Sequence, residues 1–381
     1  MRLVNDHVRV TVPATSANLG PGYDCMGLAL GLRDTADLWA TTGPTRVEVT
    51  GVGAGEVPTG SNNLVAAAAH HTLDVLGTSQ VGLHISCVNR IPHGSGLGSS
   101  AAAIVAGIQL ARGLVGPQCL TDADVLQLAT EMEGHPDNVA PAIFGGVTLA
   151  WMGSAPRPGS GEDGVGPDSC GDAGSGGPQE DCEEEEPLTQ GPAQTGESEI
   201  SSFIADRHYT LALSRTGARE VFDQGPQHDQ VARVARLGTA DGLACTVLVP
   251  KFRVSTEQAR RALPMEVPHE EAAFNVARAS LLALILAGVA PRAHLMDATA
   301  DALHQDYRRP VMPATMALVD LLRDQGYPAV ISGAGPSVLV LDALPLALVE
   351  EARAAGWQVE RLPLESSGAK LRVSRLGQTI D

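Results

Sequence analysis

The chain has 381 residues, of which 44% are hydrophobic, so it can bury a large core and form two or three domains. Its formal net charge of −18 argues against nucleic acid as a partner, because a phosphate backbone is bound by patches of Lys and Arg. No run of 18 apolar residues is present, so neither a membrane-spanning helix nor a membrane partner is expected. The six cysteines include no Cys-x-x-Cys pair, which favours reduced thiols over a zinc site. No secretory signal is visible, and a cytoplasmic location is the default expectation.

The first block, residues 1–152, alternates two kinds of segment. Runs of β-branched residues that end at Gly or Pro predict strands over 8–12, 46–52 and 81–88. Segments rich in Ala and Leu predict helices over 62–76, 99–114 and 121–132. We expect this block to form the first domain.

Residues 153–242 have a different composition. The part from 153 to 200 holds twelve acidic residues against one basic residue, together with eleven Gly and six Pro. Such a segment cannot bury enough apolar surface to offset the entropy of ordering the chain. We therefore expect a long acidic insertion, largely disordered up to residue 200, with a strand over 203–213 as one alternative. Protein docking and solubility at high salt are both open as its role.

The last block, residues 243–381, again alternates strands and helices. Strands are expected over 243–249, 330–331 and 338–341, and helices over 257–263, 269–286 and 312–325. This alternation predicts a second domain with a two-layer α/β or α+β fold.

A glycine-rich loop precedes the predicted helix over 99–114. Gly94, Gly96 and Gly98 stand at alternate positions, which lets the backbone turn tightly and approach a ligand closely. The following helix start presents unpaired N–H groups and the positive end of the helix dipole, which is an anion site. The segment is neither a Walker A loop nor a dinucleotide-binding G-x-G-x-x-G. We predict phosphate binding along the whole segment: Pro92, His93, Gly94, Ser95, Gly96, Leu97, Gly98, Ser99, Ser100, Ala101 and Ala102. Residues 92–98 are called the glycine loop below.

A second polar segment follows the predicted helix over 121–132. Glu133 is placed near the helix end, and His135, Asp137 and Asn138 come within five residues of it. A carboxylate near bound phosphate is what Mg²⁺ requires, because this ion takes one or two carboxylates together with phosphate oxygens. The residues alone leave a solvated Asx turn as an equal alternative.

Three segments resemble the motifs of the GHMP kinases, a family named after galactokinase, homoserine kinase, mevalonate kinase and phosphomevalonate kinase. The central segment PHGSGLGSSAA, from residue 92, is similar to the family's phosphate-binding motif. PATSANLGPGYD, from residue 13, and ISGAGPS, from residue 331, are similar to its first and third motifs. EGHPDNVAPAIFGG, from residue 133, resembles in particular the members that phosphorylate homoserine.

The resemblance implies an α+β, two-domain GHMP kinase fold interrupted by the acidic insertion. Residues 1–152 would form an N-terminal ribosomal-protein-S5-like α/β domain that binds ATP, and residues 243–381 a C-terminal ferredoxin-like α/β sandwich. It also implies transfer of phosphate from ATP to a small alcohol, L-homoserine, with Mg²⁺. Another alcohol such as mevalonate, a catalytically inactive binding protein, and an interaction protein acting through the acidic segment are the alternatives. A homodimer is left open.

The same resemblance implies roles for single residues. The homoserine site would contain Asn18, Asp24, His135, Arg260 and Arg308, with Asp24 facing the ammonium and with Asn138 and Thr256 as further candidates. Ser100 and Glu133 would hold Mg²⁺. Asn62 or Asn63 would lie near adenine, unless the pair only caps a helix. The chain has no Lys near these motifs, since Lys251 and Lys370 are its only two, so a dedicated base is uncertain and Asp137 is the candidate.

Overall fold

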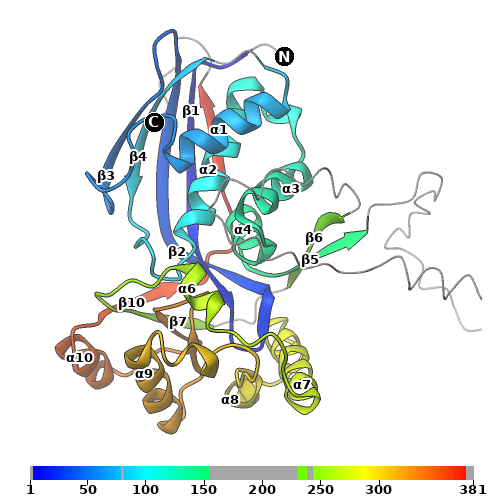
Figure 1. The fold of residues 1–381 in the computed structure, drawn as a ribbon, viewed down its shortest axis with the longest axis vertical. Helices are drawn as coiled ribbons and strands as arrows, with labels where there is room; N and C mark the ends of the chain where they lie inside the picture. The colour runs from blue at the N-terminus through cyan, green and yellow to red at the C-terminus, as the bar shows by residue number, and fades with distance from the viewer. Residues whose placement is uncertain (1–2, 79–80, 155–229, 238–242, 375–381) are drawn as a thin grey trace, which may run out of the picture. The chain divides into compact units, whose positions relative to one another are not determined.

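The computed structural model describes residues 3–78, 81–154, 230–237 and 243–374. These residues form two β-sheets, each packed against helices (Figure 1). Within the described residues no helix has both the length and the apolar character needed to cross a membrane.

The first sheet has seven strands in the order β11-β1-β2-β4-β3, with β5 beside β2 and β6 beside β5. Neighbouring strands are antiparallel except for the parallel pair β3–β4. The strands are β1 (His7–Asn18), β2 (Gly22–Thr41), β3 (Arg46–Gly51), β4 (Gly82–Asn89), β5 (Val147–Ser154), β6 (Gln230–Leu237) and β11 (Lys370–Ser374). The helices that pack on this sheet are α1 (Leu64–Val75), α2 (Ser99–Val115), α3 (Asp122–Glu133) and α4 (Pro136–Phe144).

The second sheet has four antiparallel strands in the order β10-β7-β9-β8. They are β7 (Ala244–Val249), β8 (Ala329–Ile331), β9 (Val338–Val340) and β10 (Gln358–Pro363). Helix α9 (Pro313–Asp324) precedes β8, and α10 (Leu346–Ala354) joins β9 to β10. This β-α-β-β-α-β order is the ferredoxin-like arrangement, so that prediction is confirmed. Between β7 and α9 lie α6 (Thr256–Arg261), α7 (His269–Leu286) and α8 (Leu295–Ala298).

Two strands of the first sheet come from parts of the sequence outside residues 1–152. Strand β6 lies inside the range assigned to the insertion, and its partner β5 runs on to Ser154, which pairs with Gln230. The chain therefore leaves and re-enters the sheet at neighbouring positions. Strand β11 pairs with β1, so the second block returns to the first sheet. The strand expected over 203–213 lies outside the described residues.

The long strand β2 passes directly beneath helix α4. A Cβ atom on Gly27 would lie 2.0 Å from the Asp137 carbonyl oxygen, so only glycine permits this approach. The contact brings the first turn of α4 against the sheet, close to the end of β1.

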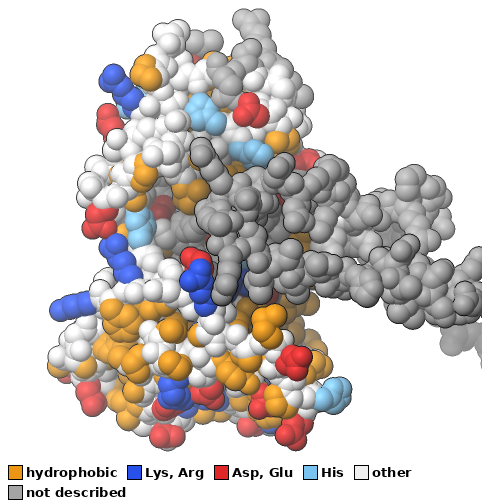
Figure 2. Space-filling model, in the orientation of Figure 1, with side chains coloured by type: hydrophobic (Ala, Val, Ile, Leu, Met, Phe, Trp, Pro, Cys, Tyr) orange, Lys and Arg blue, Asp and Glu red, His pale blue; other side chains and the backbone are white. Residues whose placement is uncertain are grey.

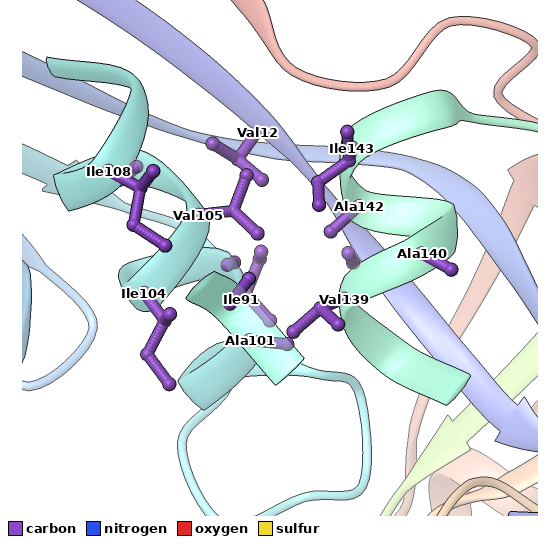
Figure 3. Close-up of a cluster of buried hydrophobic side chains, with 14 of the residues drawn as sticks. Val12, Ile91, Ala101, Ile104, Val105, Ile108, Val139, Ala140, Ala142 and Ile143 are labelled. Carbon is purple, nitrogen blue, oxygen red and sulfur yellow. The ribbon is translucent and has the colours of Figure 1, made fainter. Parts of the chain in front are cut away.

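Helices α2 and α4 share one apolar core with β1 (Figure 3). Val105 of α2 faces Val139 and Ile143 of α4, with Val12 of β1 beside them, and all four are buried. Burial of each such side chain contributes roughly 1.5–3 kcal/mol. This packing fixes both helices relative to the sheet, and with them the directions in which their N-termini point.

Arg33 of β2 ties the sheet to the segment that leads into β11. Its guanidinium donates hydrogen bonds to the carbonyls of Thr11, Ser367 and Gly368 and pairs with Glu365 at 3.1 Å. Partial burial would raise the pKa of Glu365, but the hydrogen bonds from Arg33 and Ser367 outweigh it and lower the pKa from 4.5 to about 2.

A carboxylate with a lowered pKa stabilises the fold above its ordinary pKa, and this contribution is lost as the pH falls toward the lowered value. We expect Glu365→Gln to reduce the free energy of unfolding by about 2 kcal/mol at pH 7 and by less at pH 3. Urea unfolding at both pH values measures this difference. Glu360→Gln, at an exposed position of β10, is the matched control. An equal loss at both pH values would contradict the ion-pair account.

Candidate active site

The three segments that carry the sequence motifs meet at one point. The Thr15 amide of β1 donates to the Leu97 carbonyl of the glycine loop at 3.1 Å. The turn over residues 332–337, between β8 and β9, is called the serine turn below. Its Gly333 amide donates to Ala17 O, and its Ser337 amide donates to Ser95 O, each at 3.1 Å. Segments more than 200 residues apart in the chain therefore form a single backbone network.

One serine hydroxyl lies at the centre of this network. Ser332 Oγ donates to the Gly96 carbonyl at 2.7 Å and lies 2.8 Å from Ser16 Oγ. Gly96 has φ +82°, and a Cβ atom there would lie 2.2 Å from Ser332 O. The middle glycine of the loop is thus required both by its backbone conformation and by the closeness of the serine turn.

Helix α2 opens toward the same point. Gly98 precedes the helix with φ +68°, and no side chain caps the helix start. The first amide of α2 that donates to a carbonyl one turn earlier is that of Ala102, which donates to the Gly98 carbonyl. The amides of Ser99, Ser100 and Ala101 have no such intrahelical partner, and together with the helix dipole they form an anion site.

An apolar cavity of about 350 Å³ lies beside α2. Its walls include Val49, Val57 and Ala106, and the glycine loop borders it at His93 and Gly94. Asn63 caps α1, since its side chain accepts from the Val65 amide and donates to the Pro58 carbonyl. Asn62 is exposed and also lines the cavity.

A second, charged cavity of about 160 Å³ adjoins the first, and both are lined by Gly94, Ser99 and Ser100. It brings together every side chain for which the sequence predicts a substrate, metal or catalytic role: Asn18, Asp24, Ser100, Glu133, His135, Asp137, Asn138, Thr256, Arg260 and Arg308. Of the predicted phosphate-binding residues, Leu97 and Ala101 have buried core side chains and can offer a ligand only their backbone.

One wall of the charged cavity is an ion pair. Arg260 and Asp24 make two hydrogen bonds, at 2.9 and 3.3 Å. Burial lowers the pKa of Arg260, but the charge of Asp24 outweighs it, so the pKa is raised. The backbone of Asp24 is left-handed at φ +55°, and its amide donates to Asn18 Oδ1 at 2.9 Å. Asn18 in turn donates to the Gly333 carbonyl, which ties the carboxylate to the serine turn.

Helix α6 carries two further residues of this wall. Its start is fixed by a capping box in which the side chains of Ser255 and Gln258 each accept from the other's amide. Thr256 is the first residue of the helix, and Arg260 lies one turn later. Thr256 and Arg260, both predicted to bind the substrate, therefore project from the same short helix.

The lining of the charged cavity also contains a buried guanidinium. Arg308 is 2% exposed, and its Nη1 donates to Gly333 O and to His304 Nδ1, each at 3.0 Å. Its Nε has no hydrogen-bond partner, and no carboxylate among the described residues lies within ion-pair distance. Burial lowers the pKa of Arg308. A buried cation that lacks a carboxylate partner is a strong recognition element for an anion.

His304 was not predicted from the sequence as part of this site. Its Nε2 donates to the Gly20 carbonyl at 2.8 Å, and its Nδ1 accepts from Arg308, so the ring is neutral. Burial lowers its pKa, in keeping with that state. His304 lies in the segment LHQDYR that also carries Arg308 and resembles a family motif, but only Arg308 was given a role from it.

The polar segment from Glu133 to Asn138 joins two helices. Glu133 ends α3, and His135 precedes α4. The segment therefore forms a helix start and not an isolated Asx turn. Asp137 is buried in the first turn of α4 and is hydrogen-bonded to His135 Nδ1. Burial lowers the pKa of His135, but the bond to Asp137 outweighs it, and the pKa is raised.

Glu133 and Ser100 both line the charged cavity and are in direct contact. Ser100 Oγ donates to Glu133 Oε2 at 2.8 Å. The pKa of Glu133 is raised, chiefly by burial, although the Ser100 hydrogen bond acts in the opposite direction. The described residues contain no cluster of three or more His, Cys, Asp or Glu side chains suited to a metal. One carboxylate and one hydroxyl beside a phosphate site nevertheless fit Mg²⁺, which takes its remaining ligands from phosphate and water.

Comparisons with known proteins agree with this geometry. Residues 63–146 match the model of the GHMP kinases N terminal domain, and residues 286–356 match that of the GHMP kinases C terminal domain. The chain is 42% identical to a homoserine kinase of Clavibacter michiganensis over 96% of this chain and 94% of that protein. It is 39% identical to a homoserine kinase of Streptomyces avermitilis over 96% and 95%.

Solved structures share the fold. The crystal structure of homoserine kinase from Cytophaga hutchinsonii superposes with a TM-score of 0.66 at 22% identity, covering 96% of this chain and 98% of that chain. The sequence similarity extends over nearly the full length of both partners. The chain therefore belongs to the GHMP kinase family and is a relative of its homoserine kinases.

Proposed function

We propose that the chain is a homoserine kinase, an ATP:L-homoserine O-phosphotransferase that produces O-phospho-L-homoserine in the cytoplasm for threonine biosynthesis. One observation supports homoserine as the substrate, and not only kinase activity in general. The cavity beside the glycine loop holds two guanidinium groups, Arg260 and Arg308, and beside them Asp24, which is paired with Arg260 and takes no part in the proposed metal or base chemistry. This arrangement complements a small zwitterion, and the relatives that match over nearly the whole chain are named homoserine kinases.

In the proposed complex, adenine occupies the apolar cavity, with Asn62 at its edge. The phosphates follow the glycine loop to the start of α2, where the amides of Ser99, Ser100 and Ala101 stabilise their negative charge. Because both cavities border Ser99 and Ser100, the terminal phosphate would reach the charged cavity without any movement of the loop.

The amino acid occupies the charged cavity. Its carboxylate pairs with Arg308, which lacks a carboxylate partner among the described residues. The same carboxylate also pairs with Arg260, which it shares with Asp24. Its ammonium group lies against Asp24. In the free protein Asp24 and Arg260 pair with each other, so one can accept the positive group of the substrate and the other its negative group. Asn18, His135, Asn138 and Thr256 complete the wall. The hydroxyl of the side chain then points toward the glycine loop.

Glu133 and Ser100 would hold Mg²⁺, which when bound offsets the charge of the phosphates. The substrate hydroxyl attacks the terminal phosphorus in line, and the chain contributes mainly through positioning and electrostatics. Neither lysine of the chain lines the charged cavity. Asp137, held by His135 and buried in the first turn of α4, is the proposed acceptor for the hydroxyl proton.

Substrate selectivity tests the proposed function. In an assay of ATP-dependent ADP release, we expect L-homoserine to be turned over at least about 100-fold more efficiently than mevalonate or galactose, because neither sugar nor hydroxy acid offers an ammonium group to Asp24. Phosphorus NMR of the product should show a phosphate ester on the side-chain oxygen. Efficient use of mevalonate, or no turnover of homoserine, would refute the assignment.

The metal role of Glu133 is tested by Glu133→Gln. The amide keeps the size of the side chain but loses the charge, so we expect kcat to fall by about 100-fold or more while the melting temperature is kept. Glu131→Gln is the matched control, because Glu131 is exposed on the same helix and outside the cavity. Equal turnover in the two variants would remove Glu133 from the site.

A further inference from the structure

A third cavity, of about 400 Å³, borders the glycine loop at Pro92, His93, Gly94 and Ser95 and has no part in the proposed reaction. The rest of its lining comes from the segment after β7 and from the end of α10. We call it the basic cavity. Figure 2 shows several Lys and Arg side chains along the boundary between the part with α1 and α2 and the part with α9 and α10.

The lining of the basic cavity has a positive charge. It contains Lys251, Arg253 and Arg353, and no Asp or Glu among the described residues that line it. This is notable in a chain with a net charge of −18. Lys251 forms no hydrogen bond or ion pair with another described residue. Among the described residues, Arg353 donates only to the Val359 carbonyl, and no described carboxylate pairs with it.

The same cavity offers apolar surface for a ring. Trp357 and Phe252 line it beside the basic groups. A smaller cavity of about 150 Å³ shares Pro92, Val249 and Gln358 with it and is lined chiefly by aliphatic side chains such as Leu97 and Val247. Cationic groups next to aromatic and aliphatic walls are suited to an organic anion with a planar or apolar body.

Two contacts link the basic cavity to the proposed ATP site. His93 lines both cavities and packs against Gly53, where a Cβ atom would lie 2.3 Å from its ring. Arg253 packs its stem beside Gly94 and pairs with Glu56 at 3.0 Å. Glu56 directly precedes Val57, which lines the apolar cavity. An anion in the basic cavity would compete with Glu56 for Arg253 and so act on the segment that borders the nucleotide.

We propose that the basic cavity binds a small organic anion carrying an aromatic or apolar ring, and that this ligand changes the affinity for ATP. The ligand contacts Gly94 and Ser95, which also line the charged cavity, but it touches none of the side chains proposed to hold homoserine. Its main effect therefore falls on the KM for ATP.

The full-length protein is titrated with 8-anilinonaphthalene-1-sulfonate, an anionic ring probe, in the presence of saturating non-hydrolysable ATP analogue. We expect one saturable site, measured by dye fluorescence and calorimetry. In the double variant Lys251→Gln/Arg353→Gln the dissociation constant should rise by about tenfold or more. The control Arg46→Gln/Lys370→Gln removes the same charges from exposed strand positions outside the cavity and should bind as the wild type does.

Trp357→Leu provides a second variant that keeps all three basic groups. It should weaken dye binding and reduce energy transfer from tryptophan to the bound dye. Complete displacement of the dye by the nucleotide analogue, beyond the weakening of about threefold that reciprocal coupling allows, would overturn the site, and so would equal affinity in the charge variant and its control. Melting temperatures show whether each variant folds. If either the charge variant or Trp357→Leu does not fold, dye binding by the remaining one tests the site.

Kinase assays with the dye test the coupling, and only this part depends on the proposed function. We expect the dye to change the KM for ATP by about threefold or more in the wild type and to have no effect in the charge variant. Dye binding without any change in this KM would overturn the coupling. Dye binding by a protein that does not phosphorylate homoserine would refute the proposed function and leave the site standing.

Discussion

The hydrogen bond from the Ser332 hydroxyl to the Gly96 carbonyl holds the two halves of the site together. It fixes the glycine loop against the serine turn, and through Ser16 it also fixes the end of β1. The open amides at the start of α2, the carboxylate of Asp24 and the guanidinium of Arg308 each depend on one of these three segments. Because the segments lie far apart in the sequence, the site exists only once both sheets have folded and docked.

Charge arrangement gives this scaffold its selectivity. Arg308 is buried, its guanidinium is held by His304 and Gly333, and it meets no carboxylate in the described part of the chain. Asp24 and Arg260 neutralise each other. A zwitterion can pair its carboxylate with Arg308 and place its ammonium group against Asp24. A cationic ligand leaves Arg308 without a carboxylate, and an anionic ligand gains no contact from Asp24. Leaving a buried charge unpaired costs more free energy than an ordinary hydrogen bond supplies.

Local features of the sequence predicted most of the longer helices, because periodicity and caps are local properties, although α4 and α10 were not predicted. The helix over 269–286 has the predicted bounds, and α2 begins at Ser99 as expected. The long strand β2 escaped notice because Gly27 and Gly31 interrupt its pattern, and their role is set by contacts with α4 and Pro363. Strand β6 was missed because its pairing with β5 is a long-range property. The resemblance supplied the charged residues of the cavity, but His304, a buried neutral partner of Arg308, could be found only in the structure.

The most direct test of the account compares L-homoserine with two analogues that each lack one charge. The first, 4-hydroxybutyrate, has no ammonium group, and the second, 3-aminopropan-1-ol, has no carboxylate, while both keep the hydroxyl that accepts phosphate. We expect kcat/KM with ATP to fall by at least about 100-fold for each analogue, because the first loses the contact of its ammonium group with Asp24 and the second leaves Arg308 without a carboxylate. Turnover of either analogue within about threefold of homoserine would contradict recognition of a zwitterion and with it the function proposed for this cavity.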